Sequence, residues 1–236
     1  MVCPALEHIR IILVEPAGAL NVGAAARVMA NMGLTRLVVV KPRCEVQGEE
    51  ARRMAVHAGG ILEQAWIVDT LPEALTGCVR AIATTARERE LSTPLELPEA
   101  ALPWLLQSAT GDEAAEATAL IFGPEDRGLS NEELNYAQRF VRIPSDSDYS
   151  SLNLAQAIAV CCYDLRRATQ VQPQPVLRET EQARISPRVA LDKMEDFFQH
   201  LESILLKIGY LYPHTTVSRM EKFRRFFLRA APNEQE

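Results

Sequence analysis

The chain has 236 residues, of which 47% are hydrophobic, and this is enough for one domain of good size plus a smaller appendage. Its formal net charge of −6 and pI of about 5.4 count against a dedicated nucleic-acid binder, because such proteins usually carry a net basic domain. The apolar runs IRIILV and ALIF are too short to span a membrane, and the N-terminus lacks a signal-peptide pattern. We therefore expect a cytoplasmic protein.

The cysteines and histidines indicate neither a disulfide framework nor a metal site. The five cysteines are odd in number and include no CxxC pair, and Cys161 and Cys162 lie in an apolar helical stretch that suits core thiols. The four histidines are scattered, without the spacing that places two ligands on one helix face. We expect no metal.

Apolar, strand-like runs alternate with helical segments over the first two-thirds of the chain. This alternation predicts an α/β fold with a mostly parallel sheet covered by helices. Strands are expected at residues 9–16, 36–42, 66–69, 80–86, 117–125 and 139–144. Helices are expected at residues 21–33, 97–109, 131–138 and 152–168. Within the segment 49–65 a helix is expected from residue 49 as far as the glycine pair at 59 and 60. Asn21 is expected near the cap of the first helix, with Gly33 as its stop signal.

A change of composition divides the chain after residue 168. Residues 169–186 are polar and contain two prolines, as in a linker, and residues 187–236 read as a helical extension of the domain formed by 1–168. Pro187 is expected just inside the start of the first helix, and a second helix is expected from about Thr216. Two short helices cannot fully bury each other, so we expect them to dock on the main domain or on a second subunit.

The last helical segment is locally basic. Residues 218–231 carry one acid, Glu221, against five basic residues, namely Arg219, Lys222, Arg224, Arg225 and Arg229. This pattern is typical either of a solvated helix face or of a basic end for a partner.

Three loops with unusual polar residues each follow a predicted strand. The first, EPAGALNVGAAAR, lacks both common phosphate-binding signatures, but its small residues permit close backbone approach, and Arg27 is either a surface arginine or an anion ligand. The second, FGPEDRGL, is either a tight turn with solvated acids or part of a site. In the third, YSSLN, Ser150 or Ser151 suits a helix cap or a polar ligand site. Open α/β sheets bind ligands at this edge, so we expect the loops to form one site.

In this order and spacing, NVGAAAR, IFGPEDRGL and IPSDSDYSSLNLAQAIAV resemble the three motifs of the SPOUT-class 2′-O-ribose RNA methyltransferases, in the SpoU/TrmH branch, over residues of about 8 to 168. The tail is similar to the helical extension of the TrmJ group, which methylates a pyrimidine ribose in the tRNA anticodon loop. The resemblance implies a C-terminal trefoil knot in the sheet domain, S-adenosylmethionine as the methyl donor, and a homodimer that binds tRNA.

The resemblance also implies roles for individual residues. The catalytic positions would be Asn21, Arg27, Glu125, Ser151 and Asn153, with Arg27 reaching the cofactor of the other subunit. The cofactor pocket would be formed by Thr84, Thr85, Ala86, Gly123, Gly128, Ile143, Ser150, Ser151 and Leu152. Ala24, Ala25 and Met29 are expected in the dimer interface, and Pro124 departs from the polar or basic residue common at its position.

Two other functions are compatible with the same motifs. One is 2′-O-methylation of ribosomal RNA, and the other is an RNA-binding SPOUT protein without catalysis. A serine hydrolase is disfavoured because the chain has no G-x-S-x-G elbow.

Overall fold

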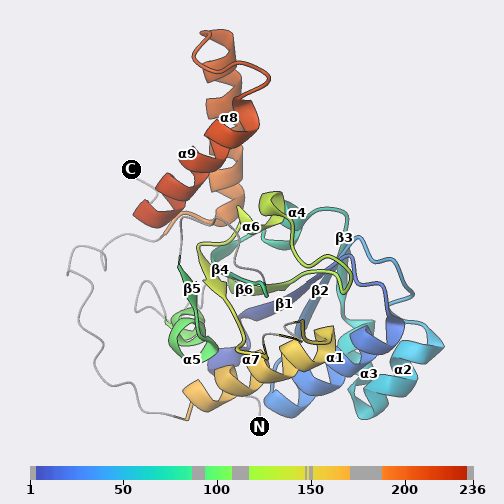
Figure 1. The fold of residues 1–236 in the computed structure, drawn as a ribbon. Helices are drawn as coiled ribbons and strands as arrows, with labels where there is room; N and C mark the ends of the chain where they lie inside the picture. The colour runs from blue at the N-terminus through green and yellow to red at the C-terminus, as the bar shows by residue number, and fades with distance from the viewer. Residues whose placement is uncertain are drawn as a thin grey trace.

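The computed structural model describes residues 4–86, 94–107, 117–146, 148, 151–170 and 188–232. Within these residues the strands form one seven-stranded parallel sheet of order β3-β2-β1-β6-β4-β7-β5, with helices on both faces (Figure 1). The strands are β1 Ile9–Val14, β2 Arg36–Val40, β3 Trp66–Val68, β4 Cys78–Thr84, β5 Leu95–Glu96, β6 Ala117–Phe122 and β7 Arg139–Val141. The predicted α/β class and its six strands are confirmed, and β5 is an addition.

The central strands are apolar on both faces because both faces are covered. In β1, Ile11 lies between Leu37 of β2 and Leu120 of β6, and it contributes to the core on one side of the sheet. The next residue, Ile12, contributes to the core on the other side. Successive side chains of a strand point to opposite faces of the sheet, so the central strands contribute to two separate hydrophobic cores.

One layer of helices covers the lower face of the sheet in Figure 1 and another covers the upper face. The lower layer consists of α1 Ala19–Met32, α2 Glu49–Ala55, α3 Gly59–Glu63, α5 Pro98–Ala101 and α7 Leu154–Ala168. The upper layer consists of α4 Leu71–Ala74, α6 Asn131–Leu134, α8 Leu191–Lys207 and α9 Thr216–Ala230. Three 3₁₀ turns complete the described elements, namely η1 Pro4–Leu6, η2 Val56–Ala58 and η3 Leu102–Leu106.

The run of small residues in α1 serves the close packing of α1 against α2. A Cβ atom on Gly23 would lie 2.2 Å from the carbonyl oxygen of Ala51, so only glycine permits this approach. Ala25 and Met29 are fully buried in the core of their own chain. The prediction that these two residues form a dimer interface is therefore wrong, whereas Ala24 is partly exposed.

Several predicted helix boundaries are also corrected. The glycine pair does not end a helix: α2 stops at Ala55, and α3 begins at Gly59. The segment predicted as one helix at 97–109 is α5 followed by η3, because Pro103 cannot donate the hydrogen bond that would continue an α-helix. Gly33 ends α1 in the left-handed conformation with φ of 82°, as predicted.

The two C-terminal helices form a hairpin that stands on the upper face of the sheet (Figure 1). Leu191 of α8 enters the core of that face, and the carboxylate of Asp192 accepts a hydrogen bond from the backbone N–H of Gly77 at 3.2 Å. The predicted docking on the main domain is confirmed, and α9 begins at Thr216 as predicted. The first helix begins at Leu191, and Pro187 and most of the predicted linker lie outside the described residues.

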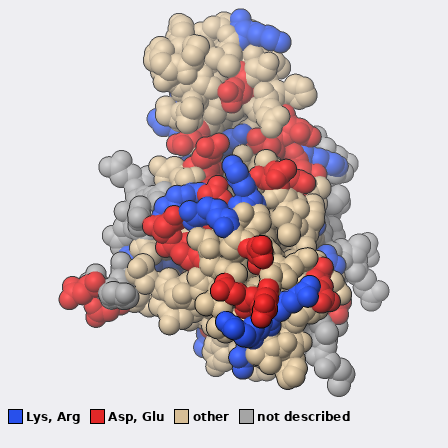
Figure 2. All heavy atoms as spheres, turned by 90° about the vertical axis from the view of Figure 1, so that its right-hand side faces the viewer, with Lys and Arg blue, Asp and Glu red and all other residues tan. Residues whose placement is uncertain are grey.

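The face that carries α2, α3 and β3 shows basic and acidic side chains intermixed (Figure 2). This face has no continuous basic surface. None of the described helices is long and apolar enough to cross a membrane.

Candidate active site

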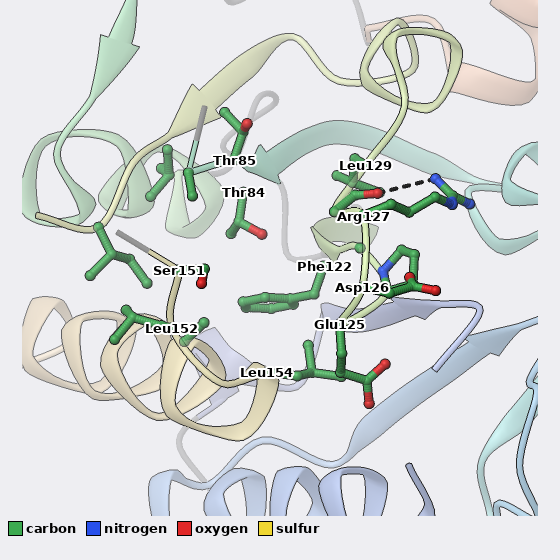
Figure 3. Close-up of a pocket in the computed structure, with 17 residues that line it drawn as sticks. Thr84, Thr85, Phe122, Glu125, Asp126, Arg127, Leu129, Ser151, Leu152 and Leu154 are labelled. Atoms are coloured by element: carbon green, nitrogen blue, oxygen red, sulfur yellow. Dashed lines mark hydrogen bonds between the residues drawn. The ribbon is translucent and has the colours of Figure 1, made fainter. Parts of the chain in front are cut away.

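The three loops identified in the sequence meet at the carboxyl ends of β1, β4, β6 and β7. Two of them, together with the end of β4, enclose a cavity of about 260 Å³ (Figure 3). It is lined by Thr84, Thr85, Ala86, Phe122, Gly123, Pro124, Glu125, Asp126, Arg127, Gly128, Leu129, Val141, Ile143, Ser151, Leu152, Leu154 and Ala157. All the residues predicted for the cofactor pocket line this cavity, except Ser150, which lies outside the described residues.

The loop at residues 123–129 is a tight turn that requires glycine at two positions. A Cβ atom on Gly123 would lie 2.3 Å from the backbone nitrogen of Leu129, so the loop can close on itself only without one. Gly128 adopts a left-handed φ of 64°, and its N–H donates to the carbonyl of Pro124 at 2.9 Å. The backbone conformation of this cavity wall is therefore set by its glycines.

Two arginines fasten the same loop to its surroundings. Arg127 donates to the carboxylate of Glu133 at 2.8 and 2.9 Å and to that of Glu15 at 3.1 Å. Arg43, which follows β2, makes a bidentate ion pair with Asp126 at 2.8 and 3.0 Å. Sequence reasoning missed these pairs, because opposite charges in separate loops give only a weak signal.

The carboxylate of Glu125 turns away from the cavity toward the start of α1 (Figure 3). It accepts hydrogen bonds from the backbone N–H groups of Ala17 at 2.9 Å and Gly18 at 3.2 Å, and from Nδ2 of Asn21 at 2.8 Å. Partial burial alone would raise the pKa of Glu125, but these hydrogen bonds outweigh it and lower the pKa. Glu125 thus remains ionised and satisfies free N–H groups at the N-terminus of α1.

Asn153 joins the third loop to the first. Its Oδ1 accepts from the N–H of Ala155 at 2.9 Å as the N-cap of α7, and its Nδ2 donates to Oδ1 of Asn21 at 3.0 Å. A continuous chain of hydrogen bonds therefore connects Glu125, Asn21 and Asn153, three of the predicted catalytic residues.

The predicted cap of α7 is wrong, whereas Asn21 lies near the cap of α1 as predicted. Helix α1 begins at Ala19 with Gly18 as its N-cap, so Asn21 lies inside the first turn, where its amide is free to bridge Glu125 and Asn153. Helix α7 is capped by Asn153 in a capping box with Gln156, so Ser151 does not cap it. Ser151 is exposed and lines the cavity instead.

Arg27 stands apart from the other predicted catalytic residues. Its side chain is exposed on α1 and makes no hydrogen bond or ion pair with another described residue. It does not line the cavity of its own chain. One subunit alone therefore does not bring Arg27 to the predicted cofactor pocket.

Sequence reasoning also missed the apolar part of the cavity wall, formed by Phe122, Leu129, Val141, Leu154 and Ala157. These residues belong to apolar runs that read as ordinary core. Together with the hydroxyls of Thr84 and Ser151, they form a wall that suits a ligand with a flat apolar part and polar ends.

Comparison with known proteins identifies the family of the chain. A family model described as the SpoU rRNA Methylase family matches residues 8–163, and the chain belongs to this family, as the three motifs predicted. A second model, the C-terminal domain of the tRNA methyltransferase TrmJ, matches residues 192–236.

Individual relatives match almost the whole chain. The chain is 40% identical to the tRNA (cytidine/uridine-2′-O-)-methyltransferase TrmJ of Klebsiella pneumoniae, over 98% of this chain and 92% of that protein. It is 39% identical to the tRNA (cytidine/uridine/adenosine-2′-O-)-methyltransferase TrmJ of Pseudomonas aeruginosa, over 98% and 90%. The crystal structure of TrmJ from Z. mobilis ZM4 matches with a TM-score of 0.80 at 30% identity, covering 96% of this chain and 92% of that one.

Proposed function

We propose that this protein transfers a methyl group from S-adenosylmethionine to the 2′ hydroxyl of a pyrimidine nucleotide in the anticodon loop of tRNA. The observation that carries the proposal is the similarity to curated tRNA 2′-O-methyltransferases over 98% of the chain, which includes both the sheet domain and the C-terminal hairpin. The arrangement of the three motif loops also supports it, because two of them line one cavity and the first is joined to both through Asn21.

The cavity residues that would hold the cofactor are Thr84, Thr85, Ala86, Gly123, Gly128, Ile143, Ser151 and Leu152, with Ser150 beside them in the sequence. When bound, S-adenosylmethionine supplies an electrophilic methyl group on a sulfonium. The apolar wall would exclude water from the reacting groups.

Arg27 would act on the RNA rather than on the cofactor pocket of its own chain. A guanidinium stays protonated at neutral pH, so Arg27 would bind the phosphate beside the target ribose and stabilise the negative charge that develops on its O2′ atom. Asn21, Ser151 and Asn153 would position the ribose, while Glu125 holds the amide of Asn21 in place.

This arrangement requires a homodimer in which Arg27 faces the partner's cofactor pocket. Helices α1 and α7 lie side by side, and Leu20, Val160 and Tyr163 on them are exposed large hydrophobic residues, which suits a two-fold interface (Figure 1). We further propose that the segment from β6 to α7 forms the trefoil knot that the resemblance implies.

The central test is the Arg27→Ala variant. We expect methyl transfer to fall by at least about 100-fold, because one preorganised charge at a reacting centre contributes on that order, while cofactor binding is retained. Transfer of labelled methyl to total tRNA and to ribosomal RNA measures the activity and its target, and a thermal shift with S-adenosylmethionine measures binding. Full activity in Arg27→Ala would refute its catalytic role, and methylation of ribosomal RNA alone would refute the target.

The shared site is tested by mixing two inactive subunits. Arg27→Ala and Gly123→Ala damage different halves of each proposed site, so random mixed dimers would regain about a quarter of wild-type activity. The absence of any recovery, with mixed dimers present by mass spectrometry, would show that each subunit works alone.

A further inference from the structure

Arg43 lies outside the three motif loops and follows strand β2. It does not line the cavity of the candidate active site. It nevertheless contacts the first loop, at residues 15–18, and the second loop, at residues 123–129. The partners of its guanidinium, Glu15 and Asp126, are 28 and 83 positions away along the chain. Arg43 therefore joins two parts of the candidate site that are remote in sequence.

Two hydrogen bonds connect Arg43 to the first loop. Its Nε donates to the carbonyl of Glu15 at 3.1 Å, and its backbone N–H donates to the carbonyl of Pro16 at 3.0 Å. Helix α1 begins at Ala19, directly after this loop, and carries Asn21 in its first turn. Arg43 thus holds the chain at the turn from β1 to α1.

The backbone of Glu15 needs such support. It adopts a left-handed conformation with φ of 44°, which is uncommon for a residue other than glycine and persists where neighbouring groups hold it. Its N–H donates to the carbonyl of Val40 at 2.8 Å, and its carboxylate accepts from Arg127 at 3.1 Å. The third contact is the one from Arg43 to its carbonyl, so the turn that leads to α1 depends in part on Arg43.

The outer end of the Arg43 guanidinium meets the second loop. It forms the bidentate ion pair with Asp126, a residue that lines the cavity. Because each partner uses two atoms, the pair fixes orientation as well as distance. The two side chains are 40% and 58% exposed, and exposed pairs add little to overall stability. The main effect of the pair is therefore on the placement of the two loops.

We propose that Arg43 is a positioning residue for methyl transfer, which sets the first loop against the second. The reaction needs the ribose oxygen and the methyl carbon in close alignment, and a misplacement of about 1 Å can lower the rate about 100-fold. Asn21 follows the first loop, whereas the second loop lines the cavity. The spacing of the loops then sets the spacing of ribose and methyl group. The inference rests on the proposed function and adds to it a residue from outside the motifs.

The first experiment removes each end of the ion pair. Arg43→Gln and Asp126→Asn are each expected to lower kcat for methyl transfer by at least about 10-fold, with KM for tRNA within about threefold of wild type. The variant with both changes is expected to match Arg43→Gln, because the two residues act through one contact. The affinity for S-adenosylmethionine, measured by calorimetry, is expected to stay within about threefold of wild type.

Arg10→Gln is the matched control. The guanidinium of Arg10 also holds two backbone carbonyls, those of Ala74 at 2.9 Å and Thr76 at 2.8 Å, but it lies at the amino end of β1, away from the site. Its kcat is expected to stay within about twofold of wild type. The melting temperature of Arg43→Gln is expected within about 4 °C of wild type. An equal loss of kcat in Arg10→Gln would overturn the proposal, because general loosening of the fold would explain both.

Other roles of Arg43 give different results. A direct contact with RNA phosphate would raise KM and weaken tRNA binding in Arg43→Gln, while Asp126→Asn would behave like wild type. A role in the cofactor pocket alone would lower the affinity for S-adenosylmethionine as much as kcat. Either pattern contradicts the positioning role, as do additive losses in the variant with both changes and an unchanged kcat in Arg43→Gln.

Amide hydrogen exchange of the free protein tests the placement of the loops without any reaction. Peptides that cover residues 15–24 and 123–129 are expected to exchange at least about threefold faster in Arg43→Gln than in wild type, and at the wild-type rate in Arg10→Gln. Wild-type exchange in Arg43→Gln would refute the positioning role. Because this measurement needs neither cofactor nor RNA, a failure of the proposed function is seen separately, as the absence of methyl transfer by the wild-type protein.

Discussion

Gly123 shows at the scale of one residue how the candidate site depends on its backbone. The loop that follows β6 turns so tightly that the backbone of Leu129 and Gly128 occupies the space where a side chain on residue 123 would stand. Glycine at position 123 thus sets the path of the loop that carries Glu125, Asp126 and Arg127.

We expect Gly123→Ala to damage the cofactor pocket. The added Cβ would lie 2.3 Å and 2.5 Å from backbone atoms of Leu129 and Gly128, so the loop must move. Affinity for S-adenosylmethionine is expected to fall at least about 10-fold by calorimetry, and stability by about 1–3 kcal/mol. The matched control is Gly60→Ala, where a Cβ would have open space. If both variants bind the cofactor like wild type, the close approach at Gly123 does not shape the pocket.

Glu133 takes part both in an ion pair and in a helix cap. Its carboxylate accepts hydrogen bonds from Arg127 of the loop at residues 123–129. Glu133 also forms the capping box with Ser130 at the start of α6. Burial alone would raise the pKa of Glu133, but the hydrogen bonds from Arg127 and Ser130 lower it below its ordinary value of 4.5.

This lowered pKa predicts a pH dependence of stability. Ionised Glu133 stabilises the folded chain above the ordinary pKa, and this contribution is lost as the pH falls through the lower pKa of the folded state. At pH 7 we expect Glu133→Gln to be less stable than wild type by about 1–2 kcal/mol, and the difference to shrink toward zero in acid. Urea unfolding of both proteins from pH 7 into acid measures this difference in stability. A difference that does not change with pH would contradict the assigned role of Glu133.

At the scale of elements, the start of α7 combines a structural task with a contact in the candidate site. Asn153 caps the helix with one end of its amide and reaches Asn21 with the other. The serine before it, Ser151, faces the cavity. Both residues belong to the candidate site, but only Asn153 also stabilises the helix as its cap.

The variants Asn153→Ala and Ser151→Ala are expected to separate these tasks. Loss of the cap at Asn153 should reduce the free energy of unfolding by about 1 kcal/mol, whereas Ser151→Ala should change it by less than about 0.5 kcal/mol. We expect both to reduce methyl transfer. Chemical denaturation and the transfer assay on the same preparations distinguish the two effects, and a larger stability loss in Ser151→Ala would restore the serine as the cap.

At the scale of the whole molecule, a nearly buried ion pair ties the two C-terminal helices together beside the main domain. Arg224 of α9 makes a two-point ion pair with Glu195 of α8, and the side chains are only 15% and 10% exposed. The guanidinium also lies 4.7 Å from the ring centroid of Phe198 and 5.6 Å from that of Tyr136 in the sheet domain. The side chain of Arg224 thus contacts both helices of the hairpin and the sheet domain, in addition to the domain contacts of Leu191 and Asp192.

We expect Arg224→Met to destabilise the protein by about 3–5 kcal/mol, because it leaves the carboxylate of Glu195 buried without its partner. Replacing Glu195 as well, in Arg224→Met with Glu195→Leu, should recover most of this loss. Thermal and urea unfolding measure both variants. Additive losses in the double variant would mean that the pair is not the main link.

A large part of the architecture follows from local patterns in the chain. The alternating apolar runs predicted six strands and the parallel α/β class, since a strand buried on both faces must be apolar along its length. Gly33 and the start of α9 were located because their signals lie within one turn of the boundary. The start of α7 was not located, because Ser150, Ser151 and Asn153 are all residue types that suit an N-cap, and Asn153 is the one that caps the helix.

By itself, the sequence determined the class of fold, the family and the three segments that carry the candidate site, because these depend on residue types and spacing along the chain. Only the tertiary structure decided that Asn21 bridges Glu125 and Asn153 and that Ala25 and Met29 belong to the core. The physical reason is that hydrogen bonds and close packing join residues more than 100 positions apart, as Asn21 and Glu125 are, and local spacing carries no record of such distances.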